Sequence, residues 1–300
     1  MILSKNAFMA VVAASLSLSV LGPTAAFARA SEDLKPAPSD FASMPACVAL
    51  QEKFPELKGK TLNIGLGGYN MGFQQPVEGN PDDLEGLDPD MFDRIGACLG
   101  FDYEFQLGAF NVLITSITSG RLDVGPSIYV TPERQEQVAF VSSYQVVDGS
   151  VVPRGNPKNL QSLDDLCGMT ISAAAGTFEA TTLAPDQSAK CLEAGKPIID
   201  VLLVQNTDNA ILAVKAGRAD IHLTSKAVAA GLAKADDTLE EAFTVDLPIR
   251  NGWPIAKGNE SLQQAILEAV KVIQETGVQK LIMDKWGQSG DAQRPVELFN

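Results

Sequence analysis

Two copies of one short pattern constrain what this chain can fold into. The first copy is Ser-Gly-Arg-Leu-Asp-Val from Ser119, and the second is Ala-Gly-Arg-Ala-Asp-Ile from Ala216. In each copy a helical pattern ends at the glycine, and a short strand then runs into small polar residues that end at Ser127 or Ser225. Ligands bind at the carboxyl ends of strands in open α/β sheets. The repeat therefore predicts two similar α/β lobes with a small-molecule cleft between them, although the pattern could also serve only to close two helices.

The N-terminus has the layout of a cleavable secretory signal. A single lysine precedes an apolar stretch at residues 7–21, and the small-residue pattern Ala-Phe-Ala follows, ending at Ala28. The stretch is interrupted by serines and falls short of the roughly 20 apolar residues that a membrane helix needs; an N-terminal anchor is the alternative. We assign residues 1–28 to a signal peptide and expect the proline-containing residues 29–46 to be a tether. The mature protein is then expected in the periplasm.

Composition excludes several classes of partner. The formal net charge of −14 argues against binding nucleic acid, whose phosphates require basic patches, and against an anionic membrane surface. The chain has one histidine, His222, within an apolar strand, which we interpret as a buried structural residue. With no P-loop and no dinucleotide fingerprint, we expect no cofactor, no metal and no catalytic residue.

Four cysteines in an exported chain suggest disulfides, for which three connectivities are possible. Pairing Cys47 with Cys98 and Cys167 with Cys191 keeps each bridge local, and we favour it. The alternative is that some cysteines remain free as small buried hydrophobic residues.

Coarse periodicity places the surrounding elements. Residues 61–67 read as a strand that enters a glycine loop, and Asp88 is expected to cap a helix that Gly100 ends. Two helices are expected near the C-terminus, at residues 259–273 and 277–286, with a polar tail after them.

Six motifs occur in an order that resembles one known family. They are Gly-Leu-Asp-Pro-Asp-Met-Phe from Gly86, Ser-Gly-Arg-Leu-Asp-Val from Ser119, Thr-Pro-Glu-Arg-Gln from Thr131, Ser-Leu-Asp-Asp-Leu from Ser162, Ala-Gly-Thr-Phe-Glu from Ala175 and Ala-Gly-Arg-Ala-Asp from Ala216. Over about residues 60–287 the chain is similar to the extracellular solute-binding proteins of family 3, the polar amino-acid-binding subunits of ABC importers.

The resemblance implies an α/β fold of the type II periplasmic binding proteins, with hinged lobes joined by two crossing strands. Lobe one would hold residues 47–148 and 250–300, and lobe two residues 149–249. The implied function is capture of a small carboxylate-bearing solute, an amino acid or a derivative, for an ABC permease in the inner membrane. We expect a monomer.

The resemblance also implies the ligand site. Arg134 would clamp the ligand's α-carboxylate, because a guanidinium can donate two parallel hydrogen bonds to it. Help would come from Ser127 in lobe one and from Thr177, after Gly176, in lobe two. Aromatic walls would be Phe110 and either Tyr69 or Phe73.

Two positions depart from the family pattern. Tyr129 stands where a small hydroxyl residue is common, and Ser225 stands where an aspartate usually holds the ligand's α-ammonium. Either another carboxylate reaches the ammonium, or the ligand lacks a free primary ammonium. The sequence favours the second outcome, because Lys226 places positive charge beside Ser225.

Two other functions remain open. The family includes periplasmic cyclohexadienyl dehydratases, for which Glu179 beside Thr177 is the one candidate acid or base that the motifs place in the cleft. The second alternative is a receptor module that reports ligand occupancy to a sensor.

Overall fold

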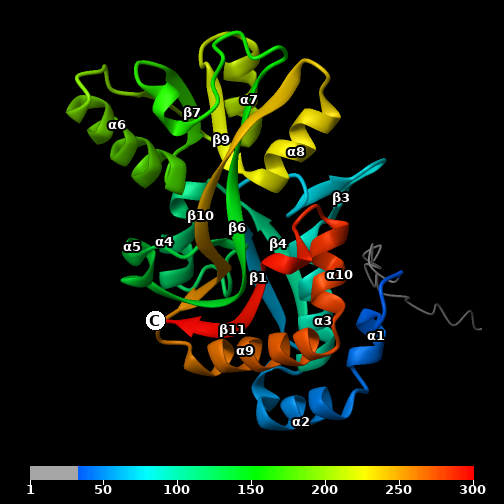
Figure 1. Ribbon diagram of the computed structural model, residues 1–300. Helices are drawn as coiled ribbons and strands as arrows, with labels where there is room; N and C mark the ends of the chain where they lie inside the picture. Colours follow the sequence, from blue (N-terminus) through cyan, green and yellow to red (C-terminus); the bar gives the residue numbers. More distant parts are fainter. Residues whose placement is uncertain (1–32) are drawn as a thin grey trace, which may run out of the picture.

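The computed structural model describes residues 33–300, apart from the side chains of residues 246–248. The expected signal peptide at residues 1–28 lies outside the described residues. Among residues 33–300 no helix is both long and apolar enough to cross a bilayer. The described chain is a mixed α/β protein whose two lobes lie one above the other in Figure 1, as the sequence predicted.

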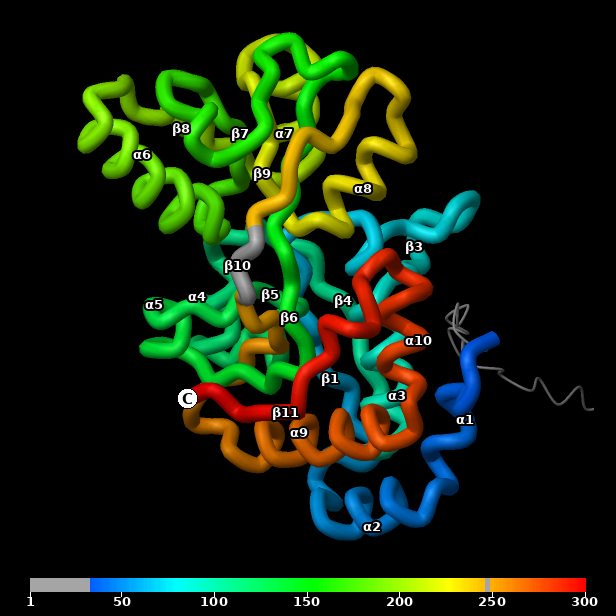
Figure 2. The backbone as a smooth tube through the Cα atoms, viewed as in Figure 1, coloured from blue at the N-terminus to red at the C-terminus, as the bar shows by residue number. Residues whose placement is uncertain are grey.

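Two long strands, β6 (Val138–Pro153) and β10 (Leu239–Ala256), join the lobes. They pair antiparallel and run side by side from one lobe into the other (Figure 2). The pairing is interrupted by a register shift between Val245 and Ile249. The expected lobe boundaries, at residues 148–149 and 249–250, fall within these two strands.

Strand β6 changes its second neighbour on the way between the lobes. In lobe one it pairs with β11 (Gln293–Phe299), up to Tyr144. In lobe two it pairs with β9 (Ile221–Ser225), beginning at Asp148. The result is a continuous sheet in the order β5 (Ile128–Tyr129), β10, β6, β9, β7 (Thr170–Ala174) and β8 (Asp200–Val204). The C-terminal residues therefore form a strand, whereas the sequence predicted a polar tail; Val296 is buried at the sheet.

The strands and helices of lobe one enclose an apolar core. Strands β1 and β4 are parallel, and Val124 links β1 to β10 through bridges to Ile64 and Ile255. Its other elements are α2 (Pro45–Lys53), η1 (Pro55–Leu57), β1 (Thr61–Leu66), β2 (Gln75–Val77), β3 (Asn80–Glu85), α3 (Leu87–Leu99), β4 (Asp102–Leu107), η2 (Phe110–Val112), α4 (Leu113–Thr118), β5 (Ile128–Tyr129), α5 (Pro132–Gln135), α9 (Glu260–Glu275), α10 (Val278–Lys285) and η5 (Gly290–Ala292).

Lobe two is a smaller α/β unit in which β7 pairs parallel with both β8 and β9. The carboxyl ends of these three strands face lobe one, so the turns and helix starts that follow them reach the space between the lobes. Its elements are η3 (Leu163–Leu166), β7 (Thr170–Ala174), the π-helix η4 (Glu179–Leu183), α6 (Ala184–Glu193), β8 (Asp200–Val204), α7 (Thr207–Lys215), β9 and α8 (Lys226–Ala235).

Helix α3 begins two residues earlier than the sequence indicated, and its N-cap is Gly86 rather than Asp88. Asp88 is fully buried and serves another purpose: its carboxylate accepts hydrogen bonds from the Ser127 backbone N–H at 2.9 Å and from Trp253 Nε1 at 2.9 Å. Gln74 also donates to it. Asp88 thereby fixes the backbone at Ser127, one of the expected ligand-binding residues.

The described part of the expected tether is folded against lobe one. Helix α1 (Pro38–Phe41) buries the Phe41 ring completely, and the Arg94 guanidinium of α3 donates to the carbonyls of Leu34 and Pro36 at 3.0 and 3.2 Å. The prediction that order begins near Cys47 was wrong. Proline content suggested a linker. Burial of the Phe41 ring in an apolar pocket, however, contributes more free energy than this segment loses in conformational entropy when it becomes ordered.

Both predicted disulfides are present: Cys47 is bonded to Cys98 within lobe one, and Cys167 to Cys191 within lobe two. The first bridge ties α2 to α3, and the second ties the start of lobe two to α6.

Replacing Phe41 by alanine should lower the free energy of unfolding by about 3 kcal/mol, because the change removes a fully buried ring from the lobe-one core. Chemical denaturation with the disulfides intact measures the change. Val48→Ala in α2 is the matched control, since that side chain is 40% exposed and should cost little. Equal stability of the two variants would mean that Phe41 does not stabilise the fold, as expected if residues 29–46 were only a tether.

Candidate functional site

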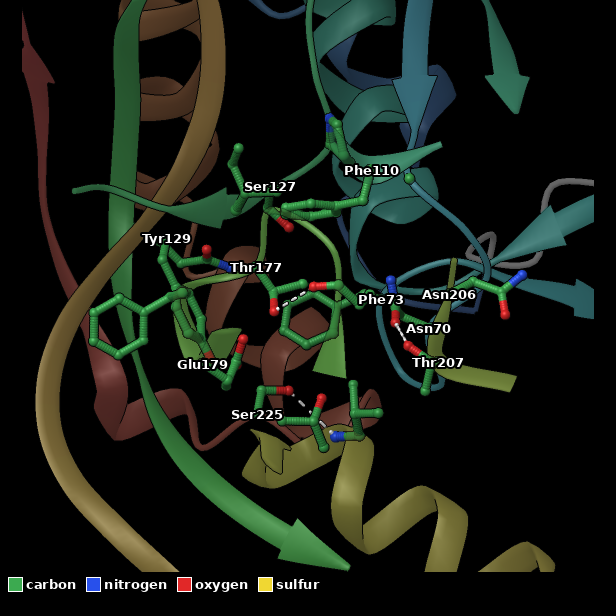
Figure 3. Close-up of a pocket in the computed structure, with 18 of the residues that line it drawn as sticks. Asn70, Phe73, Phe110, Ser127, Tyr129, Thr177, Glu179, Asn206, Thr207 and Ser225 are labelled. Carbon is green, nitrogen blue, oxygen red and sulfur yellow. Dashed lines mark hydrogen bonds between the residues drawn. The ribbon is translucent and has the colours of Figure 1, made fainter. Parts of the chain in front are cut away.

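A cavity of about 100 Å³ lies between the lobes and is lined by residues of both. One water needs roughly 10–15 Å³ of such space, so the cavity has room for a small organic molecule. Figure 3 shows side chains from β5, η2, β9 and the turn after β7 converging on it. Of the residues that the sequence predicted for a ligand site, those lining the cavity are Phe73, Phe110, Ser127, Tyr129, Arg134, Thr177 and Ser225.

The other two predicted residues lie differently. Tyr69 lines a separate groove on lobe one, so the choice between Tyr69 and Phe73 falls to Phe73, which is buried against the cavity. Gly176 does not line the cavity with a side chain; its carbonyl accepts a hydrogen bond from Arg134. Gly176 adopts a φ of +85°, a conformation that favours glycine.

Arg134 spans the two lobes. It lies in α5, whose N-cap Thr131 accepts a hydrogen bond from the Arg134 backbone N–H. Nη1 donates to the carbonyl of Tyr129 at 2.7 Å in lobe one, and Nη2 donates to the carbonyl of Gly176 at 3.0 Å in lobe two. The guanidinium lies 5.4 Å from the centre of the Phe110 ring, within cation–π range. Burial lowers the pKa of Arg134, but a guanidinium stays charged in proteins.

Phe110 can reach this position because residue 67, which it packs against, is a glycine. A Cβ at Gly67 would lie 2.6 Å from the ring of Phe110, which is closer than atoms can approach. The glycine loop after β1 therefore makes room for the aromatic wall, and Gly67 itself lines the cavity.

A second hydrogen bond crosses between the lobes at the far side of the cavity. Thr207 Oγ1 donates to Asn70 Oδ1 at 2.8 Å, and the two side chains meet in Figure 3. Thr207 is the first residue of α7, which Asn206 caps by accepting from the Asn209 backbone N–H at 3.0 Å. Sequence reasoning missed Asn206, Thr207 and Asn70. Asn206, two residues after the end of the strand at residues 200–204, was the available signal, because an asparagine there marks a helix start at a strand's carboxyl end.

Two buried carboxylates stand beside Arg134 and Tyr129. Glu179 lines the cavity and is only 6% exposed, and burial raises the pKa of its carboxyl group. Asp148 of β6 is 1% exposed and accepts a hydrogen bond from the Tyr129 hydroxyl. Burial, then the charge of Glu179, raises the pKa of Asp148 to about 8. Burial and the neighbouring Asp148 raise the pKa of Tyr129 well above its usual range.

Asp148 lies directly opposite Ser225 in the pairing of β6 with β9. Directly opposed residues of an antiparallel pair project to the same face of the sheet. The Ser225 hydroxyl caps α8 by accepting from the Val228 backbone N–H, and Lys226 is exposed. Lys226, whose positive charge favoured a ligand without an ammonium, is therefore not among the residues that line the cavity, whereas the carboxylate Glu179 is.

Three cavity-lining side chains carry a buried polar atom without a hydrogen-bond partner among the described residues: Ser127 Oγ, Asn251 Oδ1 and His222 Nε2. His222 Nδ1 lies 2.8 Å from the carbonyl of Ser172, to which it must donate, so Nε2 carries the lone pair. Burial lowers the pKa of His222 to about 4, which keeps the ring neutral. His222 is buried, as the sequence indicated, but it also contributes to the cavity wall.

The comparisons with known proteins agree with this geometry. The family model of the bacterial extracellular solute-binding proteins, family 3, matches residues 66–289. The L-cystine-binding protein TcyJ of Escherichia coli K12 is 25% identical over 75% of this chain and 82% of its own length. The arginine-binding extracellular protein ArtP of Bacillus subtilis is 28% identical over 68% of this chain and 78% of its own. An ancestral arginine-binding protein, solved with arginine bound, superposes with a TM-score of 0.67 at 27% identity, covering 77% of this chain and 99% of that one.

The raised pKa of Asp148 predicts how the stability of the ligand-free protein depends on pH. Its carboxyl pKa is near 8 in the folded protein and near 3.9 when unfolded, so the folded state holds a proton that the unfolded chain has lost. The stabilisation is complete below the unfolded pKa and is lost as pH rises through about 8. The free energy of unfolding should fall by about 1 kcal/mol between pH 7 and 8.

Denaturant unfolding of ligand-free protein at these two pH values measures the slope. Asp148→Asn should flatten it, because asparagine keeps an acceptor for Tyr129 and does not titrate. The unfolded-state titration of His222 lies mostly below this window. Asp237→Asn on the exposed surface should leave the slope unchanged; an identical slope in Asp148→Asn would mean that Asp148 is already ionised.

Proposed function

The chain belongs to the bacterial extracellular solute-binding proteins of family 3, and on that premise we propose that it captures a small amino acid in the periplasm for an ABC permease of the inner membrane. The observation that carries this proposal is the cavity between the lobes, in which Arg134 stands near Glu179. A buried cation suits the carboxylate of an amino acid and a buried carboxylate suits its ammonium.

The two hydrogen bonds between the lobes support capture by closure. Arg134 to Gly176 and Thr207 to Asn70 both join a lobe-one residue to a lobe-two residue around the cavity. A ligand that contacts both lobes binds the closed form more tightly than the open form, and it shifts the equilibrium between them by that difference. We propose that the permease receives the closed, occupied form.

Relatives support the class of ligand. TcyJ is named for L-cystine and ArtP for arginine, and the superposed ancestral protein holds arginine. Each of these ligands carries an α-carboxylate and an α-ammonium. The experiment that tests the proposal is a thermal-shift panel of L-amino acids and other small carboxylates with the mature protein: a ligand of the folded form must raise the melting temperature. A panel without any shift would contradict the proposal.

A second candidate function follows from Glu179. Burial raises the pKa of this cavity-lining carboxyl group, which suits a general acid, as an elimination of the cyclohexadienyl dehydratase kind requires. We favour binding, because the relatives TcyJ and ArtP are both named as binding proteins. Incubation with prephenate or arogenate separates the two functions: product formation supports the enzyme, and stoichiometric binding without product supports capture.

Arg134→Lys should weaken binding of the best ligand in the panel by about 1.5–3 kcal/mol, which is about tenfold to a hundredfold in Kd. Lysine keeps the charge, but a single ammonium cannot bond two carbonyls on different lobes and also grip a planar carboxylate. Isothermal titration calorimetry measures the loss. Arg154→Lys, at a side chain that is 55% exposed, is the matched control, and unchanged affinity in Arg134→Lys would remove Arg134 from the site.

A further inference from the structure

Among the described residues that line the cavity, one side chain is basic and one is acidic. These are Arg134 and Glu179. Tyr129 and His222 also titrate, but burial raises the pKa of Tyr129 well above its usual range and lowers that of His222 to about 4, so both are neutral at pH 7. The other described lining residues carry no ionisable group. The wall therefore offers a ligand one charged group of each sign.

Two more carboxyl groups are each bonded to a residue of the wall but do not line the cavity themselves. Asp88 is fully buried, and its carboxylate accepts hydrogen bonds from three donors within lobe one. Asp148 is 1% exposed and accepts a hydrogen bond from the Tyr129 hydroxyl. Lys226 is exposed and does not line the cavity either. A group inside the cavity thus meets Arg134 and Glu179 as its counter-charges.

The two charged groups lie toward one end of the cavity. Arg134 donates to the Tyr129 carbonyl, and Figure 3 shows Tyr129 and Glu179 at the same end. The charge of Glu179 acts on the Tyr129 hydroxyl, which agrees with this placement. Asn70 and Thr207 lie at the opposite end, where they are hydrogen-bonded to each other. A ligand whose charges meet Arg134 and Glu179 therefore directs its remaining atoms toward Asn70 and Thr207.

The end of the cavity at Asn70 is polar but uncharged. Asn70 and Thr207 supply an amide and a hydroxyl, and Phe73, in the same backbone turn as Asn70, supplies an aromatic ring. A charged group placed here would leave water without an opposite charge to receive it, which is unfavourable. An uncharged group loses less on leaving water, and its apolar atoms gain from burial against the ring.

We propose that the ligand is an amino acid with an uncharged side chain. Its carboxylate and its ammonium use the single pair Arg134 and Glu179, and its side chain extends toward Asn70 and Thr207. The ammonium also favours the ionised form of the buried Glu179. The inference rests on the proposed function and deepens it by naming the side-chain class. It separates this chain from its relative ArtP, which is named for arginine.

Pairs of L-amino acids that match in shape and differ in side-chain charge test the proposal. The pairs are asparagine with aspartate, glutamine with glutamate, norleucine with lysine, and citrulline with arginine. Isothermal titration calorimetry at pH 7 measures Kd for each member. In every pair that binds, we expect the uncharged member to bind at least tenfold more tightly than its charged partner. Binding only of other amino acids with uncharged side chains gives the same support.

Equal or tighter binding of a charged member would overturn this inference while leaving solute capture intact. Failure of every amino acid to bind would instead contradict the proposed function on which the inference depends.

Asn70→Asp supplies the charge that the side-chain end lacks. Aspartate keeps an acceptor for the Thr207 hydroxyl, so the hydrogen bond between the lobes can persist. We expect this variant to bind L-arginine or L-lysine at least tenfold more tightly than the wild type does, with little change for citrulline or norleucine.

Asn209→Asp is the matched control, because it adds the same charge to an exposed position of α7. It should leave the affinity for all four probes unchanged. No gain for either cationic amino acid in an Asn70→Asp variant with an unchanged melting temperature would overturn the assignment of Asn70 to the side-chain end.

Discussion

The pairing of β6 with β10 is the constraint on which the rest of the structure depends. Because both strands belong to both lobes, the lobes cannot be placed independently. Asn251 of β10 lines the cavity, and Asp148 of β6 accepts a hydrogen bond from Tyr129, which also lines it. The register shift between Val245 and Ile249 interrupts the ladder opposite Asp148.

Charge balance then decides what the cavity can hold. A short capped helix and hydrogen bonds to two carbonyls on different lobes fix the position of the Arg134 guanidinium, and so of its positive charge. Glu179 and Asp148 are buried within electrostatic reach of each other. A zwitterion matches this combination, because its carboxylate and its ammonium each meet the opposite charge at low solvent exposure.

Local sequence patterns predicted the two lobes, and a preference for local bridges predicted the disulfides, whereas Arg134 was indicated by the resemblance to the family. Glycine ends a helix, a short apolar run forms the next strand, and Thr-Pro at Thr131 starts the helix that carries the arginine. The errors arose where distant residues decide the outcome. Proline content suggested a tether, but Phe41 packs into the lobe-one core, and the polar tail pairs with β6.

What the sequence by itself determined is the α/β architecture and the polar residues that end its strands, because period, caps and turns are local properties. Only the tertiary structure decided which groups face one another. Asp148 has no motif around it, and it meets Ser225, Tyr129 and Glu179 because three segments distant in sequence converge there. Lys226 is adjacent to Ser225 in sequence yet points to solvent. Electrostatic energy depends on distance and burial in space, which residue order along the chain does not give.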